Sequence, residues 1–413
     1  LTQGGLAGGR FTKEYLSQIE CGRTKPTADT VAWLADQLGV DPLYLESGVS
    51  SVEYAESRDA IDEAERAIRA KDYDSAVAAL VELRPLPDAP DLHVRRLLAE
   101  SWARMYLGEL RTAVACLEEA RGLAEQEPFT DADRAEVLYR LGCCRYKLSS
   151  IGPALGLFTE ALTLAERSDA SCDRLRAHIF EWRSRCYRRQ RDWEAAREDI
   201  ERALELAESL EDAETVAHVE FQASIVAERT GSWVRARTHA ERARAIYEGF
   251  DDQVNVARLL NNLGGLTFLL GDSAGAVAKL EQAFRVALEA GSEPDAAQAV
   301  SSLAQVVLRN GDPVTAERHA RQALSLLVGR VDYLYEIGNA QLVLGRSLME
   351  QGKLDDAESL FAAAEASLGQ LSSASHSAAA WMAQGDLELR RGDDRAASVL
   401  YRRAAEALQE VHF

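Results

Sequence analysis

The sequence contains few residues that end helices and no long apolar segment. Of 413 residues, only 9 are proline and 27 are glycine, so helices can run with few interruptions. No apolar run approaches the roughly 18–20 residues that a membrane-spanning helix needs, and the first residues do not read as a charged-then-apolar leader. We therefore expect a cytoplasmic protein without a membrane segment.

Motifs for catalysis and for metal binding are missing as well. The six cysteines form no Cys-x-x-Cys pair and have no metal-ligand spacing with histidine, so we expect reduced thiols buried as small apolar side chains. The sequence has no GxxxxGK[ST], GxSxG or HExxH motif and no dinucleotide-binding glycine pattern. We expect no enzymatic activity and no cofactor.

The overall charge is strongly negative. The chain has 67 acidic and 47 basic residues, a formal net charge of −20, which favours solubility and disfavours general nucleic-acid binding. The apolar content of 47% is enough for a continuous core.

The segment 254–290 shows the pattern that organises most of the chain. It consists of two amphipathic runs separated by Gly271, Asp272 and Ser273. Both runs have apolar or small residues at helical spacing, which predicts two antiparallel helices. Gly264 and Ala276 would let these helices approach closely, whereas a leucine at either position would push them apart.

This helix hairpin recurs nine times in one register. Equivalent alanines, here called the marker alanines, are spaced 37 to 42 residues apart. A small residue lies twelve positions before each of them, and an alanine, or once Leu83, lies seven positions after. A fixed period of this size indicates stacked hairpins rather than a closed globule. The marker alanines are Ala76, Ala113, Ala154, Ala196, Ala236, Ala276, Ala316, Ala357 and Ala397.

The order small residue, turn, alanine, bulky residue, alanine resembles the tetratricopeptide repeat in a version of about forty residues. The resemblance implies an all-α fold in which about nine hairpins form a right-handed α-solenoid over residues 57–413. The clearest matches centre on Ala154, Ala357 and Ala397. The units of Ala196 and Ala236 depart, because Arg183 and Ala223 occupy positions where the family prefers a large apolar residue.

Residues 1–48 have a different pattern, which predicts short capped helices. Thr12 can cap a helix that runs to Cys21, and Gly22 can end it with a left-handed residue. Thr27 can cap a further amphipathic helix that ends at Gly39. Residues 49–56 read as a short linker to the repeats.

The phrases LTQxxLA, YLSQIExGRxxP and LADQLGV resemble the Cro/repressor (XRE-type) helix-turn-helix family over about 48 residues. That family has a further helix, which the resemblance places before Leu1. The resemblance implies that the Thr12–Cys21 helix enters the major groove, where Lys13, Glu14 and Gln18 meet base edges. The resemblance therefore makes double-stranded DNA the expected partner, and the residues other than these three would position the helix or hold phosphates. The ten expected DNA-binding residues are Thr2, Gln3, Thr12, Lys13, Glu14, Ser17, Gln18, Arg23, Thr24 and Lys25.

In tetratricopeptide solenoids the first helix of each hairpin lines the concave surface. Positions counted back from the marker alanines place polar and aromatic residues on that surface, and these are the candidates for ligand binding. Side-chain amides there can pair with a peptide backbone, and arginine can pair with a carboxylate. We expect a peptide or protein ligand in this groove, and the alternative is a solvated groove without a ligand. The candidates are Arg185, His218, Phe221, Arg258, Asn261, Gln298, Gln305, Asn339 and Arg346, accompanied by His178, Glu181 and Arg188.

Together these features favour a transcriptional regulator similar to peptide-sensing quorum regulators, which implies a homodimer that reads two half-sites. Two alternatives remain open. Residues 1–48 have four basic and six acidic residues, so they could be a vestigial domain on a protein-interaction scaffold. The regulator could also respond to a protein or a small molecule instead of a peptide.

Overall fold

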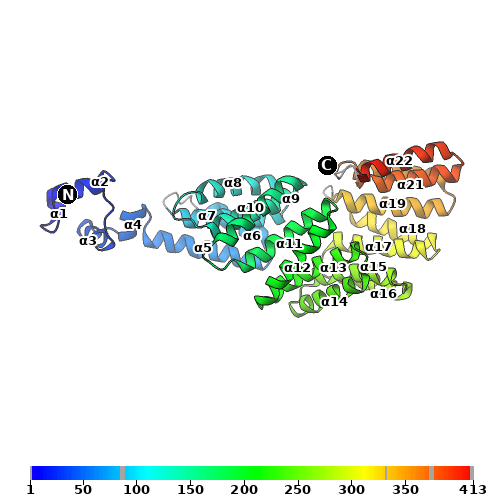
Figure 1. The fold of residues 1–413 in the computed structure, drawn as a ribbon, viewed down its shortest axis with the longest axis horizontal. Coiled ribbons are helices and arrows are strands. Elements are labelled where there is room, and N and C mark those ends of the chain that lie inside the picture. Colours follow the sequence, from blue (N-terminus) through cyan, green and yellow to red (C-terminus); the bar gives the residue numbers. More distant parts are fainter. Residues whose placement is uncertain (1, 84–88, 331–332, 372–375, 410–413) are drawn as a thin grey trace. The chain divides into compact units, whose positions relative to one another are not determined.

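The computed structural model describes residues 2–83, 89–330, 333–371 and 376–409, and it is all-helical there (Figure 1). It contains 22 helices and no strand within these ranges. The prediction of an all-α fold is therefore confirmed. The helices form two units that divide between Ser171 and Cys172.

The first unit begins with four short helices, followed by three helix hairpins. The short helices are α1 (Gln3–Ala7), α2 (Lys13–Glu20), α3 (Ala28–Leu38) and α4 (Pro42–Ser47). The hairpins are α5 (Ser51–Arg69) with α6 (Tyr73–Glu82), α7 (Pro90–Tyr106) with α8 (Leu110–Ala124), and α9 (Asp131–Lys147) with α10 (Ile151–Arg167).

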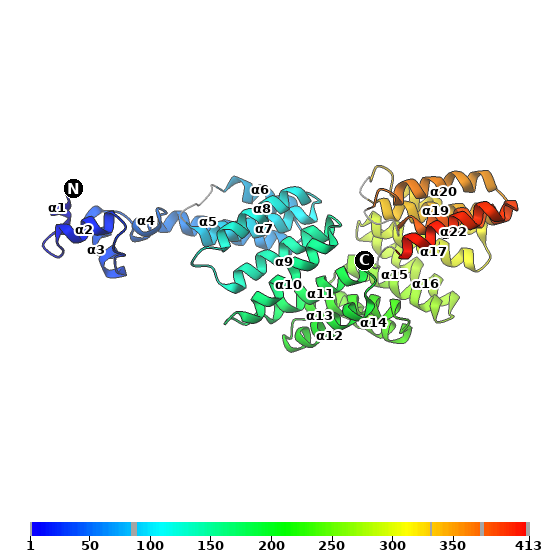
Figure 2. The same cartoon turned by 45° about the horizontal axis from the view of Figure 1, so that its top comes forward.

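The second unit consists of six hairpins in which each helix packs on the next (Figure 2). The first helices of successive hairpins also touch directly, as α15, α17, α19 and α21 do. The pairs are α11 (Asp173–Arg189) with α12 (Trp193–Ser209), α13 (Ala213–Arg229) with α14 (Trp233–Gly249), α15 (Gln253–Leu269) with α16 (Ser273–Glu289), α17 (Glu293–Arg309) with α18 (Pro313–Leu326), α19 (Leu334–Glu350) with α20 (Leu354–Leu368), and α21 (Ala378–Arg391) with α22 (Asp394–Gln409).

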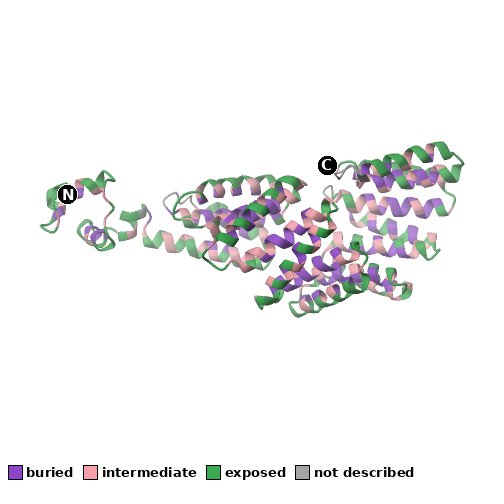
Figure 3. Ribbon diagram, viewed as in Figure 1, coloured by how far each residue is buried: buried purple, intermediate pink, exposed green. Residues whose placement is uncertain are grey.

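The nine marker alanines all lie in the second helix of a hairpin, and each is at most 1% exposed. The residues twelve positions earlier are buried too, in the first helix of the same hairpin (Figure 3). The repeating small-residue pattern therefore marks the contact between the two helices of each pair, as the sequence predicts.

Glycine at the earlier of these positions makes room for an aromatic ring. A Cβ atom on Gly142 would lie 2.6 Å from the Phe158 ring, and one on Gly345 would lie 2.5 Å from the Phe361 ring. Gly385 faces Tyr401 in the same way, at 2.7 Å. These distances are far inside van der Waals contact, so any side chain at the glycine position would displace the ring.

The repeat around Ala196, which departs from the family pattern, has a buried ion pair in place of apolar packing. Arg183 in α11 donates from Nε and Nη2 to the two carboxylate oxygens of Asp199 in α12, at 2.7 and 2.6 Å. The side chains are 15% and 6% exposed. The guanidinium also lies over the rings of Phe180 and Tyr187, so its apolar faces are covered. In the following repeat, Ala223 is buried beside Ala196, Ile200 and Val226.

The helix caps predicted in the first 48 residues are present. Thr12 accepts a hydrogen bond from the backbone N–H of Tyr15, and Gly22 has a φ of 66°. Thr27 caps α3 and Gly39 ends it. Leu16, Ala7 and Leu34 form the small core that joins α1, α2 and α3.

The expected linker differs from the observed structure. Ser50 and Glu53 form a capping box that starts α5 at Ser51, so most of residues 49–56 belong to the first helix of the repeats. Asp41 at the start of α4 also accepts a hydrogen bond from the backbone N–H of Ser51 at 3.0 Å. A Ser-x-x-Glu sequence is a helix-start signal, and here it outweighs the small residues that suggest a linker.

The cysteines are free, and three of them are buried as expected. Burial raises the pKa of Cys144 and Cys186 to about 12, which leaves these thiols protonated and unreactive. The expectation is wrong for Cys21, which is exposed at the end of α2. Within the described ranges, no helix has the length and apolar character to cross a bilayer.

Candidate DNA-binding and ligand-binding surfaces

Helix α2 presents polar side chains on the face that points away from its small core. Lys13, Glu14 and Gln18 are exposed, and Ser17 is half-buried. On the opposite face, Leu16 is only 2% exposed. Thr12 is exposed as well, but its hydroxyl oxygen is engaged as the helix cap at 3.2 Å. The polar residues predicted to meet base edges are therefore on one accessible face.

The loop after α2 is fastened to that helix. The hydroxyl of Thr24 donates to Gln18 Oε1 at 3.2 Å, and the backbone N–H of Arg23 donates to the Gln18 carbonyl at 2.8 Å. Arg23 and Lys25 are exposed. The structure thus brings these predicted phosphate contacts close to the Gln18 side chain, with its carboxamide oriented by Thr24.

The start of α1 is less favourable for a phosphate. The Thr2 hydroxyl caps α1 by accepting from Gly5 N–H at 3.1 Å. Gln3 Nε2 donates to Glu20 Oε2 at 2.5 Å. The Gln3 amide is therefore engaged by a carboxylate, whose negative charge would repel a phosphate placed there.

The second surface is formed by positions 18, 15, 11 and 8 residues before each marker alanine, here called the inner-face positions. All nine predicted ligand residues occupy such positions, on α11, α13, α15, α17 and α19. Arg258, Gln298 and Gln305 are exposed, and the other six are half-buried.

Some of the predicted arginines are held by neighbouring side chains. Arg185 donates to the buried Glu181 at 2.7 Å and its guanidinium lies 4.4 Å from the Trp182 ring centre. Arg188 donates to Gln222 at 2.9 Å, from α11 to α13. Arg258 donates to Asp295 at 2.8 Å, from α15 to α17. The guanidinium groups of Arg188 and Arg258 therefore connect successive hairpins, whereas that of Arg185 is held within α11.

Phe221 and His218 belong to the packing between α13 and its neighbours. Phe221 packs on the core cluster that contains Ala217 and Leu260. The His218 ring meets the Tyr247 ring edge-on, with centres 5.6 Å apart. Tyr247 is 1% exposed and its hydroxyl has no hydrogen-bond partner in the described structure. Sequence reasoning missed Tyr247 because it lies in the second helix of its hairpin.

Several other inner-face residues are not engaged within the described part of the chain. Gln298, Gln305 and Asn339 form no hydrogen bond with another described residue, and the buried Oδ1 atom of Asn261 has no partner. Arg346 also lacks a hydrogen bond or ion pair within the described part of the chain. These groups lie on three successive parallel helices, α15, α17 and α19.

Over the described ranges, no group of three or more histidine, cysteine, aspartate or glutamate side chains is placed so that it could hold a metal ion.

Comparison with protein families matches two models, both described as tetratricopeptide repeat. One covers residues 175–249 and 255–327, and the other covers residues 342–411. Together they account for more than half of the chain. The chain is a tetratricopeptide-repeat protein. No curated protein sequence matches it.

Solved structures share this repeat fold at low sequence identity. A Rap protein complexed with competence and sporulation factor is 18% identical, with a TM-score of 0.61 over 86% of this chain and 98% of its own. The apo form of the quorum sensor NprR from B. thuringiensis is 12% identical, with a TM-score of 0.60 over 86% and 99%. Aspartyl phosphate phosphatase F from Bacillus subtilis is 14% identical, with a TM-score of 0.56 over 87% and 95%.

Proposed function

We propose that this tetratricopeptide-repeat protein is a non-catalytic transcriptional regulator whose repeats bind a peptide and whose α2 helix reads DNA. The observation that carries the peptide part is the set of unengaged amides on parallel helices at the inner-face positions. Gln298, Gln305, Asn339 and Asn261 can each donate to and accept from a peptide bond. Their side chains form no hydrogen bond with another residue of the described ranges.

The spacing of these helices suits an extended chain. Packed helices lie about 10 Å apart, and an extended strand advances about 3.3 Å per residue. Each amide-bearing helix would therefore face about three residues of an extended peptide. The fold is shared with a Rap protein complexed with competence and sporulation factor and with the quorum sensor NprR, which supports a signalling peptide as the ligand.

The DNA part of the proposal is supported by the exposed polar face of α2, with Lys13, Glu14 and Gln18. Lysine can donate to guanine, glutamate can accept from cytosine, and glutamine can pair with adenine. A regulator of this kind would act as a homodimer, because two such helices about 34 Å apart fit successive major grooves. A peptide would control it by binding two dimer geometries with different affinity.

Native mass spectrometry of the protein purified from its own host tests the peptide proposal. We expect a bound mass of a short peptide, which is lost in Gln298→Ala with Gln305→Ala. Both residues are exposed, so these changes should leave thermal unfolding unaltered. Absence of bound peptide, together with no binding to synthetic peptide pools, would reject the peptide proposal.

A protein-interaction scaffold is the second candidate. Six acidic and four basic residues in the first 48, together with the contact of Gln3 with Glu20, are unfavourable for phosphate binding. A scaffold would bind a protein partner through the repeats and show no salt-dependent affinity for duplex DNA.

A further inference from the structure

A pocket lies between the second and third hairpins, where α9 packs against both α8 and α10 (Figure 2). It has a volume of about 320 Å³ and opens to solvent, which is at the lower end of the range for small-molecule sites. None of its lining residues occupies an inner-face position, so it is separate from the peptide surface proposed above. Its apolar lining consists of Ala124, Val137, Leu138 and Leu164.

The residue eight positions after each marker alanine explains why this space is unfilled. In three other repeats that residue is large and apolar and packs between its own hairpin and the next, namely Leu204, Phe284 and Leu324. In the repeat of Ala113 it is Arg121, which lines the pocket and is half-buried. A guanidinium keeps its charge near water, so the side chain of Arg121 leaves the apolar space open.

Two further repeats have a charged residue at this position, but in both an aromatic ring occupies the space. Beside Arg244, the buried Tyr247 packs in the apolar core. Glu365 accepts a hydrogen bond at 2.6 Å from Nε1 of Trp381, a buried residue of the next hairpin. The residues near Arg121 that are equivalent to these two aromatic residues are Ala124 and Leu138. Neither has the size of an aromatic ring, so the pocket remains.

Three charged side chains at the pocket are available to a ligand. Arg121 forms no hydrogen bond within the described ranges, and it approaches Glu118 only to 3.9 Å. The side chains of Glu125 and Glu160 are exposed and form neither a hydrogen bond nor an ion pair with another described residue. Arg134, by contrast, donates to two carbonyl oxygens at the end of α8, at 2.9 and 3.4 Å. The pocket therefore offers one cation and two carboxylates.

The spacing of these charges suits a small zwitterion. Arg121 and Glu125 are one helical turn apart on α8, so their Cβ atoms are about 5–6 Å from each other. They form no ion pair with each other within 4.0 Å. An amino group and a carboxylate on the same carbon atom fit between them, with each group next to the opposite charge. An organic acid would instead meet two carboxylates without compensation, and an amine would meet the guanidinium.

We propose that this pocket binds a free α-amino acid with a large apolar side chain. The apolar side chain lies against Ala124, Val137 and Leu164. The carboxylate accepts from Arg121, and the ammonium group donates to Glu125 and Glu160. This binding is independent of a peptide at the inner-face positions, because the two surfaces share no residue.

Isothermal titration calorimetry of the intact protein tests the assignment with defined ligands. Leucine, isoleucine, methionine, phenylalanine and tryptophan are compared with glycine, and the tightest binder is compared with its analogues that lack the amino group or the carboxylate. We expect at least one of these apolar amino acids to bind saturably, and each analogue to bind about tenfold more weakly, the usual loss for a charge-assisted contact. No binding by any of them, equal binding by glycine, or an analogue that binds as tightly as its parent would overturn the proposal.

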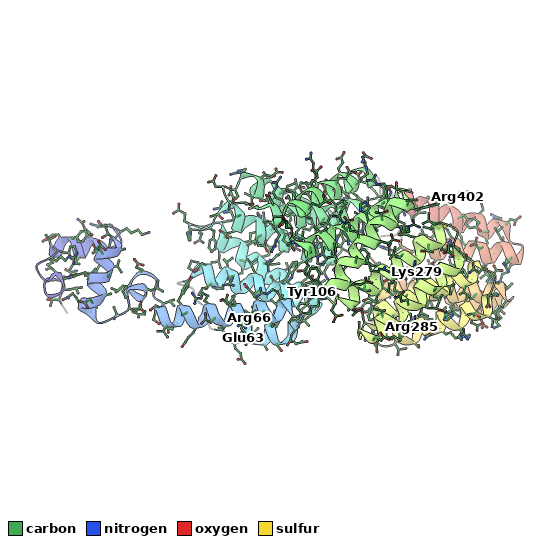
Figure 4. The ribbon with its side chains drawn as sticks, turned by 90° about the horizontal axis from the view of Figure 1, so that it is seen from below. Glu63, Arg66, Tyr106, Lys279, Arg285 and Arg402 are labelled. Atoms are coloured by element: carbon green, nitrogen blue, oxygen red, sulfur yellow. The ribbon has the colours of Figure 1, made fainter. Side chains whose placement is uncertain are left out.

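Variants of the pocket locate the binding. Arg121→Leu should abolish it, because leucine is the residue that fills the equivalent space in the repeats of Ala196 and Ala316. Glu160→Gln should weaken binding about tenfold, and it should leave thermal unfolding unaltered because Glu160 is exposed. Arg285→Leu is the matched control, since Arg285 is an exposed arginine on the second helix of another hairpin, α16 (Figure 4), and it should bind like the unaltered protein.

Glu160→Gln keeps the test valid if Arg121→Leu unfolds. Undiminished affinity in Glu160→Gln, or in a folded Arg121→Leu protein, would place the ligand elsewhere and overturn the proposal.

Discussion

Gly264 in α15 lies directly against Leu280 in α16. A Cβ atom at Gly264 would be 2.6 Å from both Cγ and Cδ2 of Leu280, and Leu280 is fully buried. The next residue, Gly265, is exposed and would place a Cβ with nothing within 4 Å. Two adjacent glycines in one helix therefore have opposite surroundings.

Gly264→Ala should destabilise the protein, and Gly265→Ala should stabilise it. Alanine in a helix is favoured over glycine by about 1 kcal/mol, which is the gain expected at Gly265. At Gly264 the displaced leucine should outweigh that gain and leave a net loss of about 1–3 kcal/mol. Urea denaturation of the two variants measures the difference. A gain of stability in both would contradict the packing described for the hairpin.

Most of the repeat architecture could be predicted because its signal is repeated nine times. The spacing of small residues at the helix contact is set by helix geometry, and it does not depend on distant parts of the chain. The start of α5 was harder to place, because Ser50 and Glu53 act as a capping box within a stretch of small residues. Local helix-start chemistry decided that boundary.

The position of an inner-face residue in its repeat does not predict whether its side chain is paired with another side chain. Arg258 and Arg346 occupy equivalent faces of their helices, yet Arg258 meets Asp295 and Arg346 meets no carboxylate. That difference depends on a residue in the next hairpin, about 37 positions away for Arg258. The buried pair of Arg183 and Asp199 likewise explains a departure that the sequence shows only as a mismatch.

Removing one member of that pair should be costly, and removing both should be tolerated. Arg183→Leu leaves Asp199 buried without its partner, at a cost of about 3–5 kcal/mol. Replacing both by leucine reproduces the residues found at the equivalent positions 141 and 157, and 344 and 360. The double variant should therefore recover most of the loss. Urea denaturation of Arg183→Leu, Asp199→Leu and the double variant forms a double-mutant cycle. Additive losses of unfolding free energy would contradict a paired role for the two residues.

Glu365 should make the stability of the last hairpins depend on pH. Burial would raise its pKa, but hydrogen bonds from Trp381 and Gln384 and the charge of Arg403 outweigh this and lower the pKa. Trp381 Nε1 donates at 2.6 Å and Gln384 Nε2 at 3.0 Å. A lowered pKa in the folded state means that the unfolded state binds the proton first as pH falls.

The contribution of Glu365 is therefore fully present above its ordinary pKa of 4.5 and is lost as pH falls through the lower folded value. Glu365→Gln should be less stable than the unaltered protein at pH 7, and the difference should shrink toward pH 3. Urea denaturation across this range measures it. A difference that does not change with pH would show that the carboxylate charge is unimportant.

The N-terminal surface gives two opposite expectations for duplex binding. Lys13→Ala should reduce affinity about tenfold, since a base-edge contact is worth about 1–3 kcal/mol. Glu20→Gln should increase affinity, because it removes the negative charge beside Gln3. Fluorescence anisotropy with a labelled duplex at several salt concentrations gives both numbers. If Glu20→Gln weakened binding, the phosphate contact assigned to this end of α1 would be wrong.

Selection of duplexes from a random library by the intact protein tests the regulator account most directly. The account predicts enrichment of two related half-sites about 10 base pairs apart, or a multiple of that spacing. It also predicts that the enrichment is lost in the protein carrying both Lys13→Ala and Gln18→Ala. A library that shows no enriched sequence with the unaltered protein, or the same sequence with that variant, would contradict a DNA-reading role for α2.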